Sequence, residues 1–198
     1  GKPLRPIRLV GCRNGVFSGK VVLGSTRPIR DLAGAVLPVW VTVRVPARAR
    51  AGAYRGRVTL RAAGDRPVRV PVSLQVADWA LPDPQDYRTW VELMQSPDTL
   101  SLEYGVKLWS PEHWRLIARS LSYLRDVGSR VLYVPLLART NLGNAESMVR
   151  WIEKGDETFA WDFSLMDRYL DLAAKQVGKP KLIVFTVWEV YLIPKRGG

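Results

Sequence analysis

The residues best suited to contact a ligand stand near the end of the chain, where one carboxylate lies among aromatic rings. Glu189 follows the apolar run at 182–187 almost directly, with Trp188 before it and Tyr191 after it. Carboxylates accept hydrogen bonds from hydroxyl groups and aromatic rings cover C–H faces, so this combination suits a sugar. The pattern predicts that all three side chains bind substrate. The alternative is a strand-end glutamate paired with a lysine or an arginine.

Polar residues also stand at the ends of two other predicted strands. Glu92 lies near the end of a short strand predicted over 89–95, and Gln95 closes it. Residues at the carboxyl ends of parallel barrel strands line the ligand site, although a salt bridge at the rim explains Glu92 equally well. Asn141 and Asn144 follow a second strand, where amides bind sugar hydroxyls or form ordinary turns. The turn interpretation is favoured, and Asn141 is kept as a substrate-binding candidate.

A long loop is predicted over 138–163, and it holds two tryptophans and the only Asp-Glu dipeptide of the chain. Trp151 and Trp161 could stack on a sugar face, but loop aromatics more often anchor a loop to its domain. Asp156 and Glu157 stand in a polar stretch that follows no predicted strand, shortly before a helix start. We interpret the pair as a solvated turn.

The sequence offers little for nucleophilic or metal chemistry. Cys12 is the only cysteine, which excludes an internal disulfide and a cysteine-rich zinc site. A lone cysteine beside strand-like sequence is most often a buried apolar residue. The only histidine, His113, lies in a helical pattern on the side away from Trp114, and we expect it to be exposed. We therefore predict no metal site.

Composition and charge describe a chain with enough apolar material for a packed core. Of its 198 residues 47% are hydrophobic, yet no apolar run reaches the roughly 20 residues of a membrane-spanning helix. No signal peptide is visible. The net charge of +12 lies wholly in residues 1–80, which hold 15 basic and 3 acidic residues. We favour a solvated sheet surface there, and keep glycan or polyanion binding by this arginine-rich segment as the alternative function.

The first part of the chain has the two-residue periodicity of half-buried strands. In the stretch VWVTVRV, valines alternate with Trp40, Thr42 and Arg44. Similar alternation recurs in YRGRVTLRA and VRVPVSLQV, with turn residues between the runs. Several short strands at this spacing predict a small β-sandwich over 1–79.

Helix signals replace the alternation in the second part of the chain. Ser110 suits the N-cap and Pro111 the first position of an amphipathic helix that Gly128 can end. An apolar strand follows, and then a second helix whose start at Ser164 resembles a capping box. Another apolar strand comes after that helix.

Strands and helices therefore alternate after a linker that prolines and acidic residues mark at 80–87. The alternation predicts two βαβ units and a parallel sheet over 88–198. Three strands with two helices leave apolar faces uncovered. We therefore predict the first part of a (β/α)₈ TIM barrel, with an open doubly wound sheet as the alternative.

The order of several sequence stretches resembles that of a known enzyme family. The stretches VWVTVRVPARARAGAYRGRVTLRA and VPVSLQVADWALPDP come first, and LEYGVKLWSPEHWRLIARSLSYLRDVGSRVLYVPLL follows. NLGNAESMVRW and FAWDFSLMDRYLDLA come next. Together they resemble the sandwich, the first helix, the second strand and the second loop and helix of glycoside hydrolase family 123 and its uncharacterised relatives. The resemblance extends from about Val36 to Tyr191.

This resemblance implies a retaining glycosidase that acts on β-linked N-acetylhexosaminides, typically N-acetylgalactosamine. The substrate's acetamido oxygen would be the nucleophile, with an aspartate to orient it and an adjacent glutamate as acid and base. No metal or cofactor is implied, the location would be extracytoplasmic, and neither nucleic acid nor membrane is expected as a partner. The family's Asp-Glu pair follows a later strand, so we expect no catalytic residue in this chain, which alone would be inactive.

Overall fold

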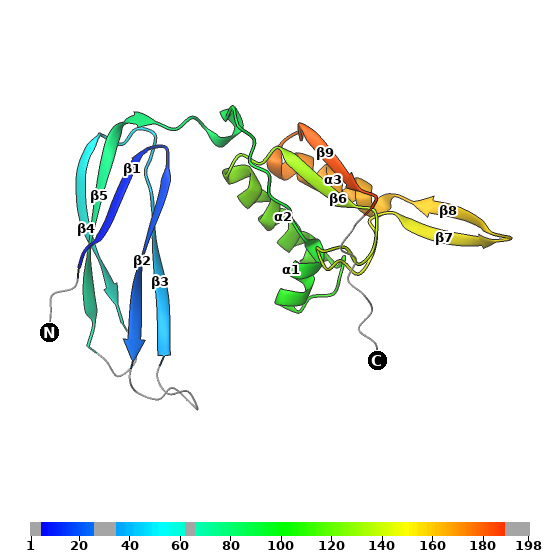
Figure 1. Ribbon diagram of the computed structural model, residues 1–198, viewed down its shortest axis with the longest axis horizontal. Helices are drawn as coiled ribbons and strands as arrows, with labels where there is room; N and C mark the ends of the chain where they lie inside the picture. The colour runs from blue at the N-terminus through cyan, green and yellow to red at the C-terminus, as the bar shows by residue number, and fades with distance from the viewer. Residues whose placement is uncertain (1–4, 26–34, 62–65, 189–198) are drawn as a thin grey trace. The chain divides into compact units, whose positions relative to one another are not determined.

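The computed structural model describes residues 5–25, 35–61 and 66–188 (Figure 1). Its contacts divide the chain into two compact units, Gly1–Asp83 and Pro84–Gly198, called unit 1 and unit 2. Unit 1 is built from strands, and all α-helices of the described chain lie in unit 2. None of these helices combines the length and the hydropathy that crossing a membrane requires.

The five strands described in unit 1 form two small sheets. They are β1 (Ile7–Arg13), β2 (Val16–Ser25), β3 (Ala35–Arg44), β4 (Gly52–Leu60) and β5 (Val68–Ala80). β5 lies between β1, which is parallel to it, and β4, which is antiparallel to it. β2 and β3 form a separate antiparallel pair. Figure 1 shows β1 and β2 beside each other where the two sheets meet.

The alternation predicted from the sequence is confirmed in these strands. Along β3, Val41 and Val43 are partly buried, whereas Trp40 and Thr42 are exposed. The inward side chains of both sheets share one apolar core, because partly buried residues of β2 and β3 pack against buried residues of β1 and β5. Cys12 is 2% exposed, which confirms that it is a buried apolar residue.

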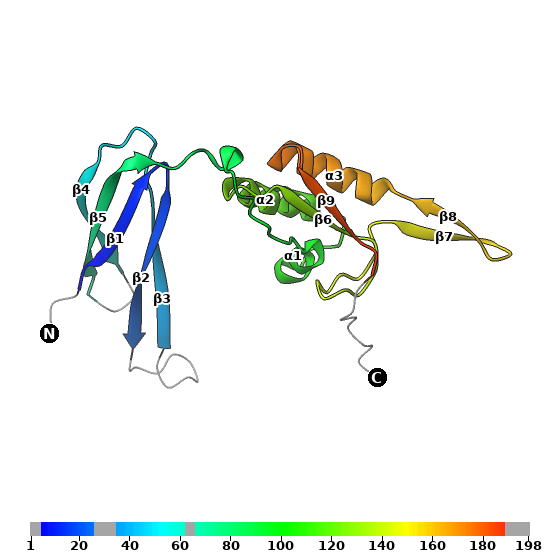
Figure 2. The same cartoon turned by 45° about the horizontal axis from the view of Figure 1, so that its top comes forward.

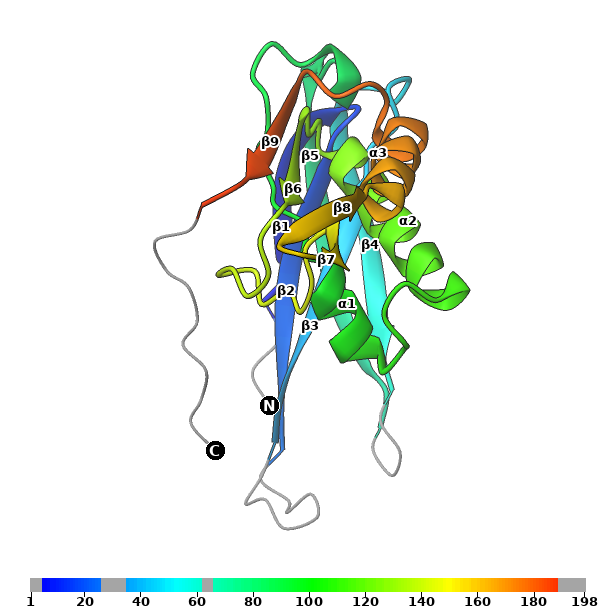
Figure 3. The same cartoon turned by 90° about the vertical axis from the view of Figure 1, so that its right-hand side faces the viewer.

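Unit 2 combines helices with two two-stranded sheets. Its elements are η1 (Pro84–Asp86), α1 (Pro97–Tyr104), α2 (Pro111–Asp126), β6 (Val131–Pro135), β7 (Arg150–Gly155), β8 (Thr158–Asp162), α3 (Ser164–Val177) and β9 (Leu182–Thr186). β6 and β9 pair in parallel. β7 and β8 form an antiparallel hairpin that projects away from the helices (Figure 2). α2 and α3 pack against each other (Figure 3).

The predicted ends of α2 are confirmed. The Ser110 hydroxyl oxygen accepts a hydrogen bond from the His113 N–H at 3.2 Å, and Pro111 is the first helical residue. Gly128, just beyond the helix, has a φ of 76°, a left-handed conformation that glycine adopts at little cost. The sequence therefore fixes both ends of this helix locally.

The other two helices differ from the prediction. The capping box proposed at Ser164 is wrong, because Phe163 is the N-cap residue of α3 and the Asp162 carboxylate accepts the Ser164 N–H at 2.9 Å. α1 was not predicted, although Ser96 caps its start and Gly105 ends it with a φ of 62°. Its eight residues carry no clear apolar stripe, so periodicity gives no signal there.

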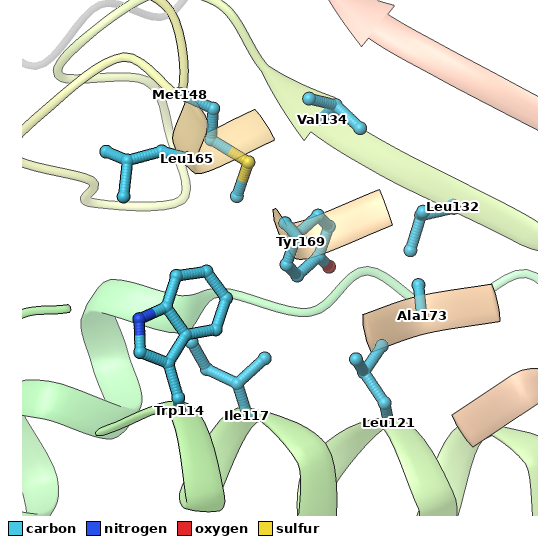
Figure 4. Packing of buried hydrophobic residues seen from close by; sticks show 9 residues of the cluster. All are labelled: Trp114, Ile117, Leu121, Leu132, Val134, Met148, Leu165, Tyr169 and Ala173. Carbon is cyan, nitrogen blue, oxygen red and sulfur yellow. The ribbon is translucent and has the colours of Figure 1, made fainter. Parts of the chain in front are cut away.

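The core of unit 2 lies between α2, α3 and β6. Figure 4 shows the side chains of α2 directed toward Tyr169, which is fully buried at the centre of the cluster. The buried members are Trp114, Ile117, Leu121, Leu132, Val134, Met148, Leu165, Tyr169 and Ala173. This core fixes β6 against the two helices and thereby positions the loop that follows β6.

The predicted fold class is wrong in both units. The stretch 89–95 forms no strand: among the described residues it makes one bridge, from Val91 to Ser129, and side-chain hydrogen bonds hold its far end. A barrel requires each strand to be paired on both edges, whereas β6 and β9 pair only with each other in the described chain. The sheets of three and two strands in unit 1 also fall short of a full β-sandwich.

Candidate functional site

The carboxyl ends of β6 and β9 meet at one edge of their sheet. The register runs from Val131 opposite Leu182 to Pro135 opposite Thr186. Just beyond it, the Leu136 N–H donates to the Thr186 carbonyl at 3.0 Å. Residues that follow either strand can therefore contribute to a common site.

The loop after β6, at 136–149, is organised around the side chain of Asn144, which is 2% exposed. Its Oδ1 accepts hydrogen bonds from the N–H and the hydroxyl of Thr140, at 3.1 and 2.5 Å. Its Nδ2 donates to the carbonyls of Leu137 and Glu146, at 2.7 and 2.8 Å. Both donors and both acceptor positions of the amide are thus used within the loop. Asn144 shapes the loop and is not available to a ligand.

Two further hydrogen bonds attach this loop to the start of α1. The Asp98 carboxylate accepts the Ala145 N–H at 2.7 Å, and the Ser96 hydroxyl donates to the Leu142 carbonyl at 2.9 Å. Asp98 is 5% exposed, and the loss of solvation on burial raises the pKa of its carboxyl above the ordinary value. The hydrogen bond from Ala145 opposes that rise in pKa.

His113 is fully buried, so the prediction that it is exposed is wrong. Its Nδ1 accepts the Trp109 N–H at 2.9 Å, and its Nε2 lies 2.7 Å from the Pro97 carbonyl oxygen. The carbonyl can only accept, so the proton belongs on Nε2 and the tautomer is fixed. The imidazole ring therefore joins the start of α1 to the start of α2. The helical pattern placed it away from the apolar stripe, but that side of α2 is covered by α1.

Gln95 also has a structural role. Its Nε2 donates to the Ile117 carbonyl at 3.2 Å, and its Oε1 accepts the Tyr169 hydroxyl at 2.9 Å. Burial raises the pKa of that tyrosine hydroxyl, which therefore stays protonated as a donor. These bonds hold the segment before α1 against α2 and α3, so Gln95 does not face a ligand.

Three predicted binding residues are exposed. Glu92 lies in the segment before α1, Asn141 lies in the loop after β6, and Trp188 follows β9 with 76% of its surface exposed. The segments that carry Asn141 and Trp188 leave the sheet at the same edge. The segment that carries Glu92 pairs through Val91 with Ser129, just before β6, and the hydrogen bond from Ser96 attaches its far end to the loop after β6. Glu189 and Tyr191 lie outside the described residues.

The tryptophans of the predicted loop belong instead to the β7–β8 hairpin. Trp151 and Trp161 are directly opposite each other, with ring centroids 5.9 Å apart and an edge-to-face angle of 77°. Phe159 packs edge-on against Trp151 at 5.7 Å. Trp151 is 64% exposed and Trp161 is 53% exposed, so they form an aromatic face on the hairpin. Cross-strand aromatic pairs of this kind stabilise a two-stranded sheet.

Asp156 and Glu157 form the turn of this hairpin and are exposed, which confirms a solvated turn. Their φ angles are 47° and 58°, the left-handed values of tight hairpin turns. The pair does follow a strand, β7, which the sequence did not reveal. No cluster of histidine, cysteine or carboxylate side chains suited to hold a metal ion occurs among the described residues.

The fold and the sequence together define a glycoside hydrolase domain. Residues 94–193, about half of the chain, match the catalytic domain of glycoside hydrolase 123. The chain is also similar to a solved family 123 glycoside hydrolase from Clostridium perfringens, described for glycolipid glycan hydrolysis. The TM-score is 0.64 at 16% identity, over 89% of this chain and 42% of that one. No curated protein matches the chain.

The chain therefore belongs to glycoside hydrolase family 123. This result confirms the resemblance found in the sequence. The matched segment includes the loop after β6 and the residues that follow β9. The chain spans less than half of the length of the solved relative.

Proposed function

We propose that this chain belongs to a retaining β-N-acetylhexosaminidase, with N-acetylgalactosamine as the favoured sugar, and that it contributes substrate-binding residues. The observation that carries the proposal is the match of residues 94–193 to a family 123 catalytic domain. The solved relative is described for hydrolysis of glycolipid glycans, which supports a glycan substrate for this protein as well.

The binding residues proposed are Trp188 and Asn141, which are exposed in the segments that leave the carboxyl edge of β6 and β9, and Glu92, which is exposed in the segment before α1. Trp188 offers an indole face to the C–H face of a sugar ring. Asn141 offers an amide that donates and accepts, and Glu92 offers a carboxylate that accepts from hydroxyls. Because Asn144 fixes the loop that carries Asn141, this amide is presented by a preorganised segment.

The chemistry proposed is assisted by the substrate. The acetamido oxygen attacks the anomeric carbon while a glutamic acid protonates the departing oxygen. The same glutamate then deprotonates the water that opens the cyclic intermediate, so the β configuration is retained. An adjacent aspartate orients the acetamide. Asp156 and Glu157 are not assigned these roles, since both are exposed in a hairpin turn, and we propose that sequence outside this chain supplies the pair.

The proposal is tested with two chromogenic substrates that differ only at C2. The gene product that contains this chain should hydrolyse p-nitrophenyl N-acetyl-β-galactosaminide but not the β-galactoside, which lacks the acetamido nucleophile. The chain of 198 residues should hydrolyse neither. Equal rates on both substrates would overturn the assisted mechanism, and activity of the chain alone would overturn the placement of the acid and base.

A tryptophan substitution tests the binding residues within the same gene product. Trp188→Ala should raise KM about tenfold and leave kcat within about twofold, because a stacking contact acts on bound substrate and transition state alike. Trp79→Ala is the matched control, since Trp79 is 55% exposed on β5 in unit 1. An unchanged KM for Trp188→Ala would remove this residue from the site.

A further inference from the structure

An apolar hollow of about 280 Å³ opens in unit 1, and none of the residues that line it belongs to the family-matched segment. Its apolar lining comes from the end of β3, the connection to β4, and β5: Val43, Val45, Val72, Leu74 and Val76. Val45 and Val76 are 3% and 1% exposed and belong to the apolar core of unit 1. The hollow is therefore lined in part by core residues. A hollow with this lining favours an apolar side chain as its occupant.

The hollow lies on the side of unit 1 where the two sheets are open. β1 packs against β2 and closes one side (Figures 1 and 3), whereas no comparable contact joins β3 to β4 in the described residues. β4 is an edge strand of the three-stranded sheet, and β3 is an edge of its pair. Along the free edge of β4, backbone N–H and C=O groups have no strand partner in the described chain. Such an edge is a template for an added strand.

Gly56 shows that the gap reaches the middle of β4. It alternates with Tyr54 and Val58, so a side chain at this position would point toward the other sheet. A Cβ placed on Gly56 meets no atom within 4 Å, which leaves open space over this part of the inward face. A glycine inside a strand weakens it and often marks the close approach of another backbone or a ligand.

The arginines around the hollow indicate the charge that a bound strand would carry on its outward side. Arg44 and Arg55 line the hollow and are both exposed, and no acidic residue is part of the lining. The surrounding residues 1–80 hold 15 basic and 3 acidic residues. Carboxylates on alternate positions of an added strand would therefore be attracted to this rim.

We propose that the free edge of β4 binds an extended peptide strand in which apolar residues alternate with acidic residues. The strand extends the β1–β5–β4 sheet by backbone hydrogen bonds. Its apolar side chains fill the hollow over Gly56, and its carboxylates lie on the outward side of the sheet, the side that carries Arg55. This binding site is independent of the carbohydrate site proposed for unit 2.

The experiment uses the whole chain and an end-blocked, fluorescent eight-residue peptide of alternating valine and glutamate. Fluorescence anisotropy measures binding, and amide hydrogen exchange locates it. We expect saturable binding. We also expect slower exchange for the backbone amides of β4 that point away from β5, toward the free edge. Gly56→Leu should weaken binding about tenfold or more, because the leucine side chain would occupy the space that an apolar side chain of the peptide fills.

The matched control is Gly24→Leu in β2, since a Cβ there also meets nothing within 4 Å and Gly24 lies outside the hollow. It should bind as the original chain does. Arg55→Glu should reverse the preference between the valine–glutamate peptide and a valine–lysine peptide. Arg69 is an exposed arginine of β5 outside the hollow, so Arg69→Glu should leave the preference between the two peptides unchanged.

Several outcomes would overturn the proposal. Equal binding to the original chain and to Gly56→Leu would place the peptide elsewhere, as would unchanged exchange along β4. Equal binding of both peptides would remove the role of charge. If sedimentation shows a dimer that Gly56→Leu abolishes and that excludes the peptide, the occupant is a second copy of the chain and not a separate acidic strand.

Discussion

Unit 1 and unit 2 bury different kinds of side chain. The large buried side chains described in unit 1 are apolar, and they come from strands that alternate between inside and outside. The buried polar side chains of the described chain all lie in unit 2: Gln95, Asp98, His113, Ser129, Thr140 and Asn144. The two units therefore rely on different balances of apolar packing and buried hydrogen bonds.

The difference has a physical consequence for function. Apolar packing tolerates substitutions of similar volume, whereas a buried hydrogen-bonded network requires particular partners at particular distances. In unit 2 the network surrounds the loop after β6, which carries the candidate residue Asn141. We infer that the polar core holds a ligand-facing loop in one geometry, which apolar packing alone would specify less strictly.

The largest expected effect is the loss of the Asn144 amide. Asn144→Ala removes the partners of two carbonyls and of the Thr140 N–H and hydroxyl in a buried site. We expect unit 2 to lose about 3 kcal/mol or more of stability, because unpaired buried polar groups keep their desolvation cost. Native-state hydrogen exchange of α2 amides measures the change, and unit 1 amides should not respond.

Asn141→Ala is the control for this prediction. Asn141 lies in the same loop and is exposed, so its removal should change stability by less than about 0.5 kcal/mol. A similar loss of stability in the two variants would contradict the division between a structural and a ligand-facing asparagine.

Two opposite isosteric swaps sharpen the comparison of the two cores. Val70→Thr places a hydroxyl in the apolar core of unit 1, and Thr140→Val removes from unit 2 a hydroxyl that donates to Asn144 and accepts the Leu142 N–H. Each should cost about 1–3 kcal/mol in its own unit, although volume is unchanged. Hydrogen exchange resolves the two units.

Thr59→Val on the exposed side of β4 serves as the control and should be within about 0.5 kcal/mol of the original chain. If Thr140→Val proved neutral, the polar network would not determine the stability of unit 2.

The smallest effect concerns the pH dependence of stability. The pKa of Asp98 is raised in the folded chain, mainly by burial, so its contribution to stability is present below the ordinary pKa and is lost as pH rises through the raised one. Asp98→Asn keeps the acceptor for the Ala145 N–H but does not ionise. The difference in free energy of unfolding between Asp98→Asn and the original chain should therefore grow in favour of the variant as pH rises toward neutrality. Urea unfolding at several pH values measures this difference.

Asp162→Asn should show the opposite trend. Hydrogen bonds from Ser164 lower the pKa of the Asp162 carboxyl, so its stabilising contribution is present at neutral pH and is lost as pH falls through that lowered pKa. The same sign of pH dependence for both variants would contradict the assigned causes.

The sequence predicted elements well where a local signal repeats. The alternation around Val41 and Val43 gave β3, and Ser110, Pro111 and Gly128 gave both ends of α2. α1 and the β7–β8 hairpin were missed because they are short and neither has a clear apolar face. The barrel was predicted by counting strands, but strand pairing depends on neighbours that a sequence pattern does not identify.

The candidate site was predicted only in part. Residue type singled out polar side chains after β6 and before α1 as candidates, but it did not separate exposed Asn141 from buried Asn144. Likewise Glu92 is exposed, whereas Gln95 is buried against Tyr169. These pairs are close in the sequence and similar in type, so the distinction lies in which other segments cover them.

The sequence by itself determined the periodicity of the strands, the helix caps, the separation of charge and the resemblance to family 123, because each depends on residues that are near one another in the chain. Tertiary structure decided which polar residues are buried, since Asn144, His113 and Gln95 find their partners across loops and between helices. Tertiary structure also left the inward face of β4 open over Gly56. Burial depends on what packs from elsewhere, and no local pattern contains that information.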